Sequence, residues 1–399
     1  MAGEPPRSGG TRARESRKGE SAAVKVWKMW RVKLAVCVLA ACLGAGSGAA
    51  QEARARSVVL ITADGLRWQE VFRGADPAFF GREETGMEGA GEVAERFGGA
   101  SAEQRRAKLM PFFWNELVKI GALYGNRDKG SEVVVRNRHR FSYPGYSEIL
   151  TGKPQDDVID SNENRPNPSY TVLEIVRREL GLPREQVALF GSWEVFEGIG
   201  AHEPGSVVIN AGFTPFEEPG LSPRLEQLSR IQFRLLTPWR TVRHDYITFE
   251  LALEYLRTKK PRLLYIALGE TDDWAHAKRY DRYLETAHYF DECVGRLWHA
   301  IQEMPEYRGR TLLIAATDHG RGPKLGNWHR HGADQKGAQY IWLAVAGPGV
   351  PAVGEARSGP RLTQSDIGPT ILEWLGIPYT KLEGVAGRPL PLAVAPSRR

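Results

Sequence analysis

The sequence predicts an α/β fold, a three-layer α/β/α sandwich in which a mostly parallel central sheet lies between two layers of helices. Strand-like and helix-like runs alternate along the chain after residue 55. The strand-like runs are almost wholly apolar, as expected of strands that are buried on both faces. Acidic and histidine residues follow several of these runs directly. Parallel sheets bind ligands beyond the carboxyl ends of their strands, so the sequence predicts a site along one rim of the sheet.

The individual elements follow from composition and periodicity. Residues 58–62 are β-branched and apolar and predict the first strand, and apolar residues at helical spacing predict a helix over 107–120. The remaining predicted elements are, in order, helix 170–180, strand 186–190, helix 247–256, strand 262–268, helix 280–302, strand 311–316, strand 340–346 and helix 367–375. Gly376 is a suitable C-cap for the last helix. Strand, helix, strand repeats favour parallel pairing with helices on both faces.

The chain is expected to divide into a leader, 1–50, and one domain, 51–399. The leader has a basic flank, a short apolar run over 34–43 and a row of small residues, which is the order of a secretory signal. Met29 is an alternative start of translation. The apolar run is too short to span a bilayer comfortably. Two polar stretches near 74–103 and 200–243 have weaker periodicity and are expected to be insertions that form a lid or a substrate wall.

The leader also sets the expected location of the protein. Residues 39–42 resemble a bacterial lipobox, so a lipid anchor at Cys42 is the alternative to simple cleavage. We therefore expect an exported protein, periplasmic or extracellular, that contacts a membrane only through such an anchor. After the leader, Cys293 is the one remaining cysteine, which excludes an internal disulfide and predicts a small buried side chain.

The net positive charge of the chain, formally +6 at pH 7, comes from the leader. Removing the nine basic and three acidic residues of 1–50 from the totals of 54 and 48 leaves 45 of each. A balanced domain without a basic and aromatic stripe gives no reason to expect a nucleic-acid partner.

Three segments carry the side chains that point to metal chemistry. Asp64 follows the first predicted strand, and Asp272 and His276 follow the strand over 262–268. Their spacing of four places both on one face of a helical turn, where they can bind one ion. Asp273 with His276 is the alternative pair, and a solvated helix N-terminus is the ordinary structural explanation.

The third segment is an Asp-His pair, Asp318 and His319, directly after the strand over 311–316. Charged and imidazole groups that emerge from a core strand need partners. His331 follows in a polar, glycine-bearing loop, and His329 competes with it for the same role.

A hydroxyl completes the set. Ser142 precedes a Pro-Gly turn and a helix-like run, so we expect it at a helix N-terminus, where backbone amides favour an anion. Metal coordination would lower the pKa of its hydroxyl and make it a nucleophile. An ordinary helix cap is the alternative.

These motifs, in this order, resemble the alkaline phosphatase superfamily, and most closely its nucleotide pyrophosphatase/phosphodiesterase-type branch. That branch carries an Asp after the first strand, a Thr or Ser nucleophile before aromatic-Pro, and later Thr-Gly, Asp-x-x-x-His, Asp-His-Gly and His-Gly motifs. The matching segments here are 62–65, 142–144, 151–152, 272–276, 318–320, 331–332 and a closing segment, 366–370. The resemblance covers residues 57–376, and the combination is more specific than any one motif.

The resemblance implies an alkaline phosphatase-like metallohydrolase domain with two divalent ions. One ion would be held by Asp272, His276 and His331. The other would be held by Asp64, Ser142, Asp318 and His319. Zinc is the expected metal because histidines accompany carboxylates, and Mn²⁺ and Fe are alternatives. Such families often place an Asn near the transferred group, and Asn162, or alternatively Asn164, matches that position.

Other candidate contacts come from their place beside these motifs. Arg321 follows the Asp-His-Gly turn and is a candidate phosphate contact. Trp68, Phe72 and Trp328 are candidate walls of the pocket. Ordinary packing is the alternative for each of the four.

Two departures from family patterns narrow the expectation. The phosphodiesterases usually carry Asn three residues after the nucleophile, where this chain has Gly145, which argues against nucleotide recognition. Sulfatases carry an Arg four residues after the nucleophile, where this chain has Tyr146, and this disfavours a sulfatase.

We expect an exported two-metal hydrolase that cleaves small phosphate esters, mono- or diesters, through a covalent phosphoserine at Ser142. A phosphoryl-type transferase and a sulfatase-like hydrolase of the same superfamily are alternatives within the fold. A non-catalytic metal-binding envelope protein is the alternative outside enzymology.

Overall fold

A computed structural model of the chain describes residues 56–392. The expected signal over 1–50, the alternative start at Met29 and the anchor at Cys42 lie outside the described residues. Within this part of the chain, every helix is too short or too polar to cross a bilayer.

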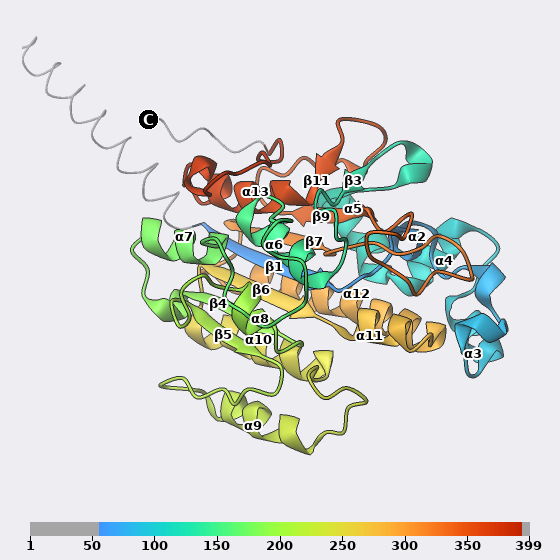
Figure 1. Cartoon of the computed structure of the whole chain (residues 1–399), viewed down its shortest axis with the longest axis horizontal. Coiled ribbons are helices and arrows are strands. Elements are labelled where there is room, and N and C mark those ends of the chain that lie inside the picture. The colour runs from blue at the N-terminus through green and yellow to red at the C-terminus, as the bar shows by residue number, and fades with distance from the viewer. Residues whose placement is uncertain (1–55, 393–399) are drawn as a thin grey trace, which may run out of the picture. The chain divides into compact units, whose positions relative to one another are not determined.

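An eight-stranded sheet runs through the centre of the described residues (Figure 1). Its order is β10-β2-β9-β7-β1-β6-β4-β5, and all neighbours are parallel except β9 with β2 and with β7. The strands are β1 (Ser57–Ala63), β2 (Gly121–Tyr124), β4 (Val187–Gly191), β5 (Val208–Ala211), β6 (Leu263–Leu268), β7 (Thr311–Ala316), β9 (Leu343–Ala346) and β10 (Gly354–Glu355). The predicted mostly parallel sheet is confirmed.

Two apolar layers lie on opposite faces of this sheet, because successive residues of β1 point to opposite sides. Val59 and Ile61 pack in one buried cluster, and Val58 and Leu60 pack in another. Helices of the first side are α2 (Trp68–Arg73), α3 (Ala90–Phe97), α4 (Ala102–Leu109), α9 (Pro223–Ile231), α10 (Asp245–Lys259) and α12 (Tyr280–Glu303). Helices of the second side are α6 (Ser142–Thr151), α7 (Val172–Glu179), α8 (Phe196–Ile199) and α13 (Ile367–Trp374). This is the expected three-layer arrangement.

Smaller elements complete the described chain. A three-stranded sheet has the order β11 (Leu362–Thr363), β3 (Val133–Val134) and β8 (Tyr340–Ile341). Short helices are α5 (Val118–Ile120), α11 (Glu270–His276), the π-helix η3 (Phe113–Leu117) and the 3₁₀ turns η1 (Pro77–Phe79), η2 (Glu83–Thr85), η4 (Arg127–Lys129), η5 (Arg184–Gln186), η6 (Gln232–Arg234), η7 (Gln364–Asp366) and η8 (Tyr379–Lys381). Cys293 is buried in α12 and unpaired, as expected.

Two predicted elements are interrupted. The predicted helix 107–120 breaks after Leu109, because Pro111 has no amide proton and its ring excludes a continuous helix, and the chain continues as η3 and α5. The predicted strand 340–346 splits at Trp342 into β8 and β9, which belong to different sheets. At this break the buried indole of Trp342 donates a hydrogen bond to the carbonyl oxygen of Leu66 at 2.9 Å.

Of the two stretches predicted to be insertions, one lies outside the central sheet and the other contributes a strand to it. Residues 74–103 hold α3 and turns beside it, whereas residues 200–243 supply β5 to the end of the sheet and then α9. In Figure 1, α9 projects below the layer that contains α10. The domain division itself stays a prediction.

Candidate active site

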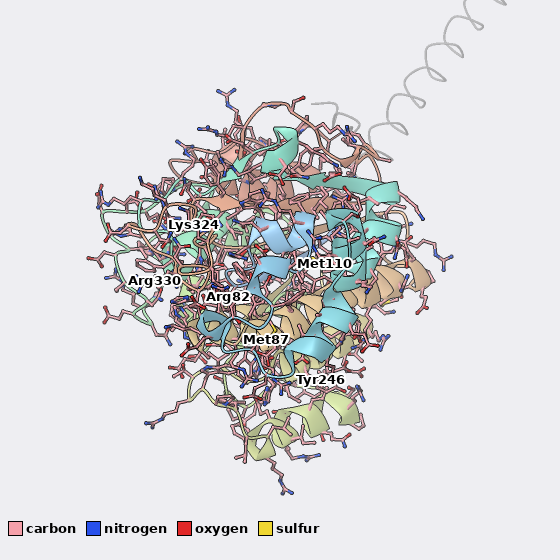
Figure 2. All side chains as sticks on the ribbon, turned by 90° about the vertical axis from the view of Figure 1, so that its right-hand side faces the viewer. Arg82, Met87, Met110, Tyr246, Lys324 and Arg330 are labelled. Atoms are coloured by element: carbon pink, nitrogen blue, oxygen red, sulfur yellow. The ribbon has the colours of Figure 1, made fainter. Side chains whose placement is uncertain are left out.

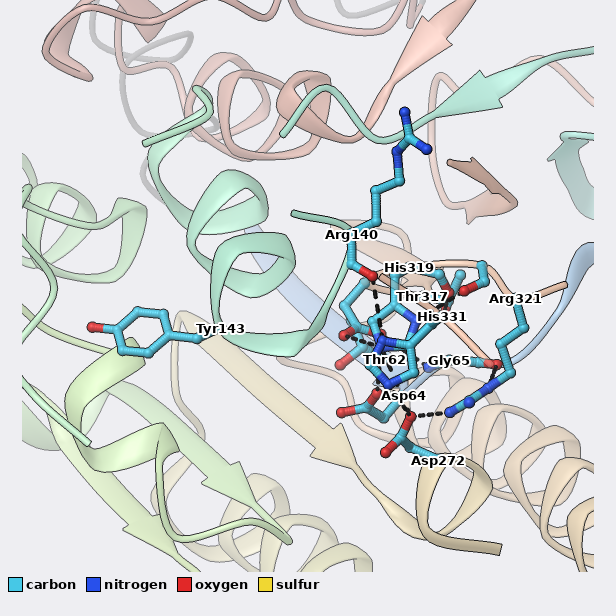
Figure 3. Close-up of polar contacts among 12 residues, drawn as sticks. Thr62, Asp64, Gly65, Arg140, Tyr143, Asp272, Thr317, His319, Arg321 and His331 are labelled. Carbon is cyan, nitrogen blue, oxygen red and sulfur yellow. Dashed lines mark hydrogen bonds and ion pairs between the residues drawn. The ribbon is translucent and has the colours of Figure 1, made fainter. Parts of the chain in front are cut away.

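Asp64 and Asp318 meet at the carboxyl ends of neighbouring parallel strands. Asp64 follows β1 and Asp318 lies just beyond β7, so the sheet brings together residues from distant parts of the sequence. The backbone amide of Gly65 donates to Asp318 Oδ1 at 2.9 Å. His319 Nε2 lies 3.3 Å from Asp64 Oδ1 and 3.4 Å from Asp318 Oδ2. Figure 3 shows this group at the rim of the sheet.

The backbone around these residues is fixed by close packing. Gln364 donates from its side-chain amide to the carbonyl oxygens of Thr317 at 3.0 Å and Asp318 at 2.6 Å, which holds the turn after β7. Gly65 has φ +58, and a Cβ there would lie 2.5 Å from Arg321 Nη2. Glycine is therefore required where the chain leaves β1.

Asp272, His276 and His331 form the second part of the site. Both Asp272 and His276 lie on α11, and His276 Nε2 is 3.1 Å from Asp272 Oδ2. His331 Nε2 lies 3.0 Å from His276 Nε2 and 3.8 Å from Asp272 Oδ1. The ring of His331 stacks on that of His319 with centroids 4.0 Å apart, so the two parts are adjacent.

The structure distinguishes the alternatives left open by the sequence. His331 lies in the cluster, whereas His329 supplies only its carbonyl oxygen, which accepts from Arg321 Nη1 at 2.7 Å. Asp272 contacts the histidines, whereas its neighbour Asp273 belongs to neither group of ligand atoms and has a buried Oδ2 without a hydrogen-bond partner. Asp273 instead lines the cavity next to Ser142, and nothing in its local sequence indicates this place.

Ser142 and Asn162 lie beside the carboxylates. Ser142 is the first residue of α6, as predicted, but Pro144 and Gly145 lie within this helix and do not form the turn that was expected before it. Ser142 lines a cavity of about 430 Å³ together with Asp64, Asn162, Asp272 and Asp273. Asn162 Oδ1 accepts from the backbone amide of Tyr143 at 3.0 Å. This contact fixes the amide group of Asn162 next to the start of α6. The alternative, Asn164, does not line this cavity.

Residues near 240 form the opposite wall of the cavity. The wall consists of Trp193, Pro238, Trp239, Arg240, Thr241 and Val242. It is held in place by an antiparallel bridge between Trp193 and Val242 and by a hydrogen bond from the amide of Glu194 to the carbonyl oxygen of Thr241 at 3.0 Å. Part of the stretch 200–243 therefore borders the site.

The proposed aromatic walls are elsewhere. Trp68, Phe72 and Trp328 are buried in the apolar cluster of one sheet face and do not line the cavity, so ordinary packing is the correct explanation. A core position and a wall position have the same aromatic composition, and the sequence offered no pattern to identify Trp193 and Trp239 instead.

Arg321 is also placed differently from the expectation. Its guanidinium is fully buried and donates to the carbonyl oxygens of Gly65 at 2.9 Å and His329 at 2.7 Å, and it forms an ion pair with Asp272 Oδ1. It is not part of the cavity lining, so it cannot contact a substrate there without leaving these partners. Arg321 instead positions Asp272 against the loop that carries the histidines (Figure 3).

The charges of the site are strongly coupled. Burial and the nearby charge of Asp64 hold the pKa of the Asp318 carboxyl well above its ordinary value. Burial lowers the pKa of His319, but the charges of Asp318 and Asp64 outweigh it and raise this pKa to about 9. Burial also holds the pKa values of His276 and His331 below the ordinary value. The last two imidazoles are therefore neutral near pH 7, the form that binds cations.

The donor set fits divalent metal ions. Asp64 Oδ1, Asp318 Oδ2 and His319 Nε2 are all buried, and none has a hydrogen-bond partner. Unpartnered buried groups of this kind are costly unless a ligand satisfies them. The ligand atoms form two sets of three, and within each set all atoms lie within 4.8 Å of one another. One set comes from Asp64, Asp318 and His319, and the other from Asp272, His319 and His331. His319 thus faces both sets, whereas the resemblance assigned it to one ion and assigned His276 to the other.

Comparison with known families gives one match. A family model described as Sulfatase matches residues 145–377, which is more than half of the chain. The match starts after Ser142 and therefore does not bear on the nucleophile. It occurs despite Tyr146, on which the expectation against a sulfatase depended, and it gives no specific support to the phosphodiesterase-type branch. A search of curated proteins gave no match.

Solved structures resemble the fold of this chain. Ps i-CgsB matches with 17% sequence identity and a TM-score of 0.52, over 84% of this chain and 74% of that one. A phosphonate monoester hydrolase from Silicibacter pomeroyi matches with 15% identity and a TM-score of 0.51, over 84% and 76%. The 2-O GAG sulfatase BT1596 matches with 13% identity and a TM-score of 0.51, over 84% and 73%. At such identities these likenesses show the fold alone.

Proposed function

This chain belongs to the sulfatase family and so to the alkaline phosphatase superfamily, and from this membership we propose that it is an exported two-metal hydrolase of small phosphate esters. The observation that carries the proposal is the set of unpartnered, buried ligand atoms next to Ser142. Without a bound ion, Asp64 Oδ1 and Asp318 Oδ2 have only the ion-pair contacts with His319, at 3.3 and 3.4 Å, and no hydrogen bond satisfies these atoms.

Divalent ions bound there, with zinc expected and Mn²⁺ or Fe as alternatives, would lower the pKa of the Ser142 hydroxyl and stabilise charge on the ester oxygens. The residues that would hold them are Asp64, Asp272, Asp318, His276, His319 and His331, with Ser142 completing one set. One carboxylate of each set, Asp64 and Asp272, lines the cavity that also holds Ser142, which supports an arrangement in which one group of ligands serves the nucleophile and the other the leaving oxygen.

Ser142 is the proposed nucleophile. Its Oγ forms a bond to phosphorus while the bond from phosphorus to the leaving oxygen breaks, and the serine proton ends on the leaving oxygen, which gives a free alcohol and a phosphoserine. Water then attacks phosphorus, one of its protons passes to Ser142 Oγ as the bond to that atom breaks, and the phosphate product is released. The Oδ1 atom of Asn162 is engaged by Tyr143, so its Nδ2 remains to donate to a non-bridging phosphate oxygen.

A second reaction, hydrolysis of sulfate esters, is favoured by the family match over 145–377. Against it stands Tyr146, whose ring is buried and packs on Phe196 with centroids 4.6 Å apart, where the sulfatase pattern has an arginine. We therefore place phosphate esters first.

The decisive experiment uses Ser142→Ala on a panel of phosphate monoesters, phosphate diesters, phosphonate esters and sulfate esters. We expect the wild type to cleave a phosphate ester and the variant to lose about three orders of magnitude in kcat/KM with its bound metal retained. Ser101→Ala is the matched control, because Ser101 also lies at a helix start but far from the cavity lining.

Three results would contradict the proposal. Full activity of Ser142→Ala on every ester that the wild type cleaves would exclude the nucleophile. Turnover restricted to sulfate esters would replace the proposed substrate class, and retention of metal without any turnover would support a binding protein.

A further inference from the structure

Exposed apolar side chains gather in one segment of the described residues. Seven large apolar side chains between residues 56 and 392 are exposed, and five of them lie between positions 231 and 246. They are Ile231, Phe233, Leu235, Leu236 and Tyr246, and Leu236 is 95% exposed. We call residues 230–246 the apolar-basic segment. It begins at the end of α9, and Figure 2 shows Tyr246 at the end of the molecule from which α9 projects.

The same segment carries unpaired positive charge. Arg230, Arg234 and Arg240 are exposed, and none of their guanidinium groups forms a hydrogen bond or ion pair with another described residue. No acidic residue occurs from Gln227 to His244. The domain 51–399 as a whole has equal numbers of basic and acidic residues, so this positive charge is local and is not part of a general basic character.

The exposed apolar side chains and the unpaired arginines together indicate which kind of partner would bind this segment. A bilayer with anionic lipids offers negative headgroups to arginines and an acyl boundary to Phe and Leu, and segments with this composition bind in its interfacial layer. A soluble polyanion would use the arginines but leave the apolar side chains in water. An apolar protein surface would use the apolar side chains but leave three cations without counter-charges.

We propose that the apolar-basic segment docks on the surface of an anionic lipid bilayer. Phe233 and Leu236 enter the interfacial layer, and Arg230 and Arg234 contact lipid phosphates. Residues 238–242 of this segment line the cavity beside Ser142, so docking would bring the mouth of the cavity close to the membrane surface. This inference does not depend on which ester the enzyme cleaves.

The test is co-sedimentation of the full chain with vesicles of phosphatidylcholine, with and without an equal part of phosphatidylglycerol. Wild type should bind the anionic vesicles, and binding should fall at 0.5 M salt. Phe233→Ser combined with Leu236→Ser, and separately Arg230→Gln combined with Arg234→Gln, should each weaken binding roughly tenfold or more. Val158→Ser combined with Val353→Ser is the matched control, because these are the two exposed apolar residues outside the segment.

All variants keep the same N-terminal residues, so any contribution of the leader is equal among them. Hydrolysis of a small soluble ester by the Phe233 and Leu236 variant should be unchanged, which shows that it is folded. Equal vesicle binding by this variant and the wild type would overturn the proposal. So would binding to heparin that matches vesicle binding and is lost only in the arginine variant, because that result indicates a site for soluble polyanions.

Discussion

At Gly145 the absence of a side chain allows α6 to pack closely on the turn that carries Asp318. A Cβ at this position would lie 2.5 Å from the carbonyl oxygen of Asp318. The first turn of α6 therefore packs directly on the backbone of the Asp318 turn, which holds the nucleophile against the carboxylates. A side chain as large as asparagine has no room at this position.

We predict that Gly145→Asn destabilises the protein by about 1–3 kcal/mol, because the new side chain must push α6 away from Asp318. Activity should fall roughly 100-fold, since a displacement near 1 Å is enough to misalign reacting groups. Urea unfolding and kcat/KM measure the two effects.

Gly91→Ala is the control for this substitution. Gly91 lies in α3 with no atom within 4 Å of a Cβ, so Ala should stabilise the protein by about 0.5–1 kcal/mol. A neutral effect of Gly145→Asn on both stability and activity would show that α6 and the Asp318 turn are not tightly coupled.

A second prediction at this scale concerns Arg321. Arg321→Met should lower the free energy of unfolding by about 3–5 kcal/mol, because it leaves buried carbonyl oxygens and Asp272 without their donor. Metal content, measured by elemental analysis, should fall with it. Arg330→Met, an exposed neighbour, should change the stability by less than about 0.5 kcal/mol. Normal metal content in Arg321→Met would exclude the positioning role.

The sequence identified the chemical types at the site better than their surroundings. Asp64, Asp318 and His319 could be predicted because polar residues directly after buried strands have few structural explanations. The residues alone left the choice between His329 and His331 open, because both lie in one loop whose path depends on distant contacts, and only the family resemblance selected His331. The role of Arg321 was mistaken, because a sequence does not show that a cation is fully enclosed.

At the scale of elements, one carboxylate joins α12 to the turn before η3. Asp291 accepts hydrogen bonds from the backbone amides of Phe112 at 2.7 Å and Phe113 at 2.9 Å. Burial outweighs these hydrogen bonds and raises the pKa of Asp291 to about 7. The folded protein therefore holds a proton at this site at pH values where the unfolded chain, with a pKa near 3.9, has lost it.

This difference predicts a pH dependence with a definite sign. Between about pH 4 and pH 7 the native state binds more protons than the unfolded state, so the contribution of Asp291 to stability falls as the pH rises. We expect the wild type to lose on the order of 3 kcal/mol relative to Asp291→Asn across this window, and to run parallel to it above pH 8. Denaturant unfolding at several pH values measures this, and parallel curves from pH 4 to pH 7 would contradict it.

Elements were predictable where one local rule acted alone. The strands at 58–62 and 311–316 are buried on both faces, and their apolar composition has no competing explanation. The prediction of one helix over 107–120 was wrong because it relied on the apolar periodicity of this stretch, whereas Pro111 interrupts the helix. The break at Trp342 has no local marker in the sequence, and the contact made there by its indole is with Leu66, 276 positions away.

For the whole molecule, bound metal should contribute to stability, because the ligands come from separate parts of the fold. At metal concentrations about 1,000 times the dissociation constant, binding adds about 4 kcal/mol, so adding Zn²⁺ to chelator-treated protein should raise Tm by roughly 5–10 °C. Asp64→Asn should abolish most of this rise. Asp157→Asn, a carboxylate that is 93% exposed, should leave it intact. An unchanged Tm on addition of Zn²⁺, Mn²⁺ and Fe²⁺ would argue against a resident metal.

The hydrogen bond from Gly65 to Asp318 spans 253 positions of the sequence. A ribosome that adds about 5–20 residues per second therefore makes the two partners tens of seconds apart. During that interval the nascent polypeptide contains Asp64 but not yet Asp318. A translation product that stops before Asp318 accordingly lacks one half of this carboxylate pair and cannot assemble the site.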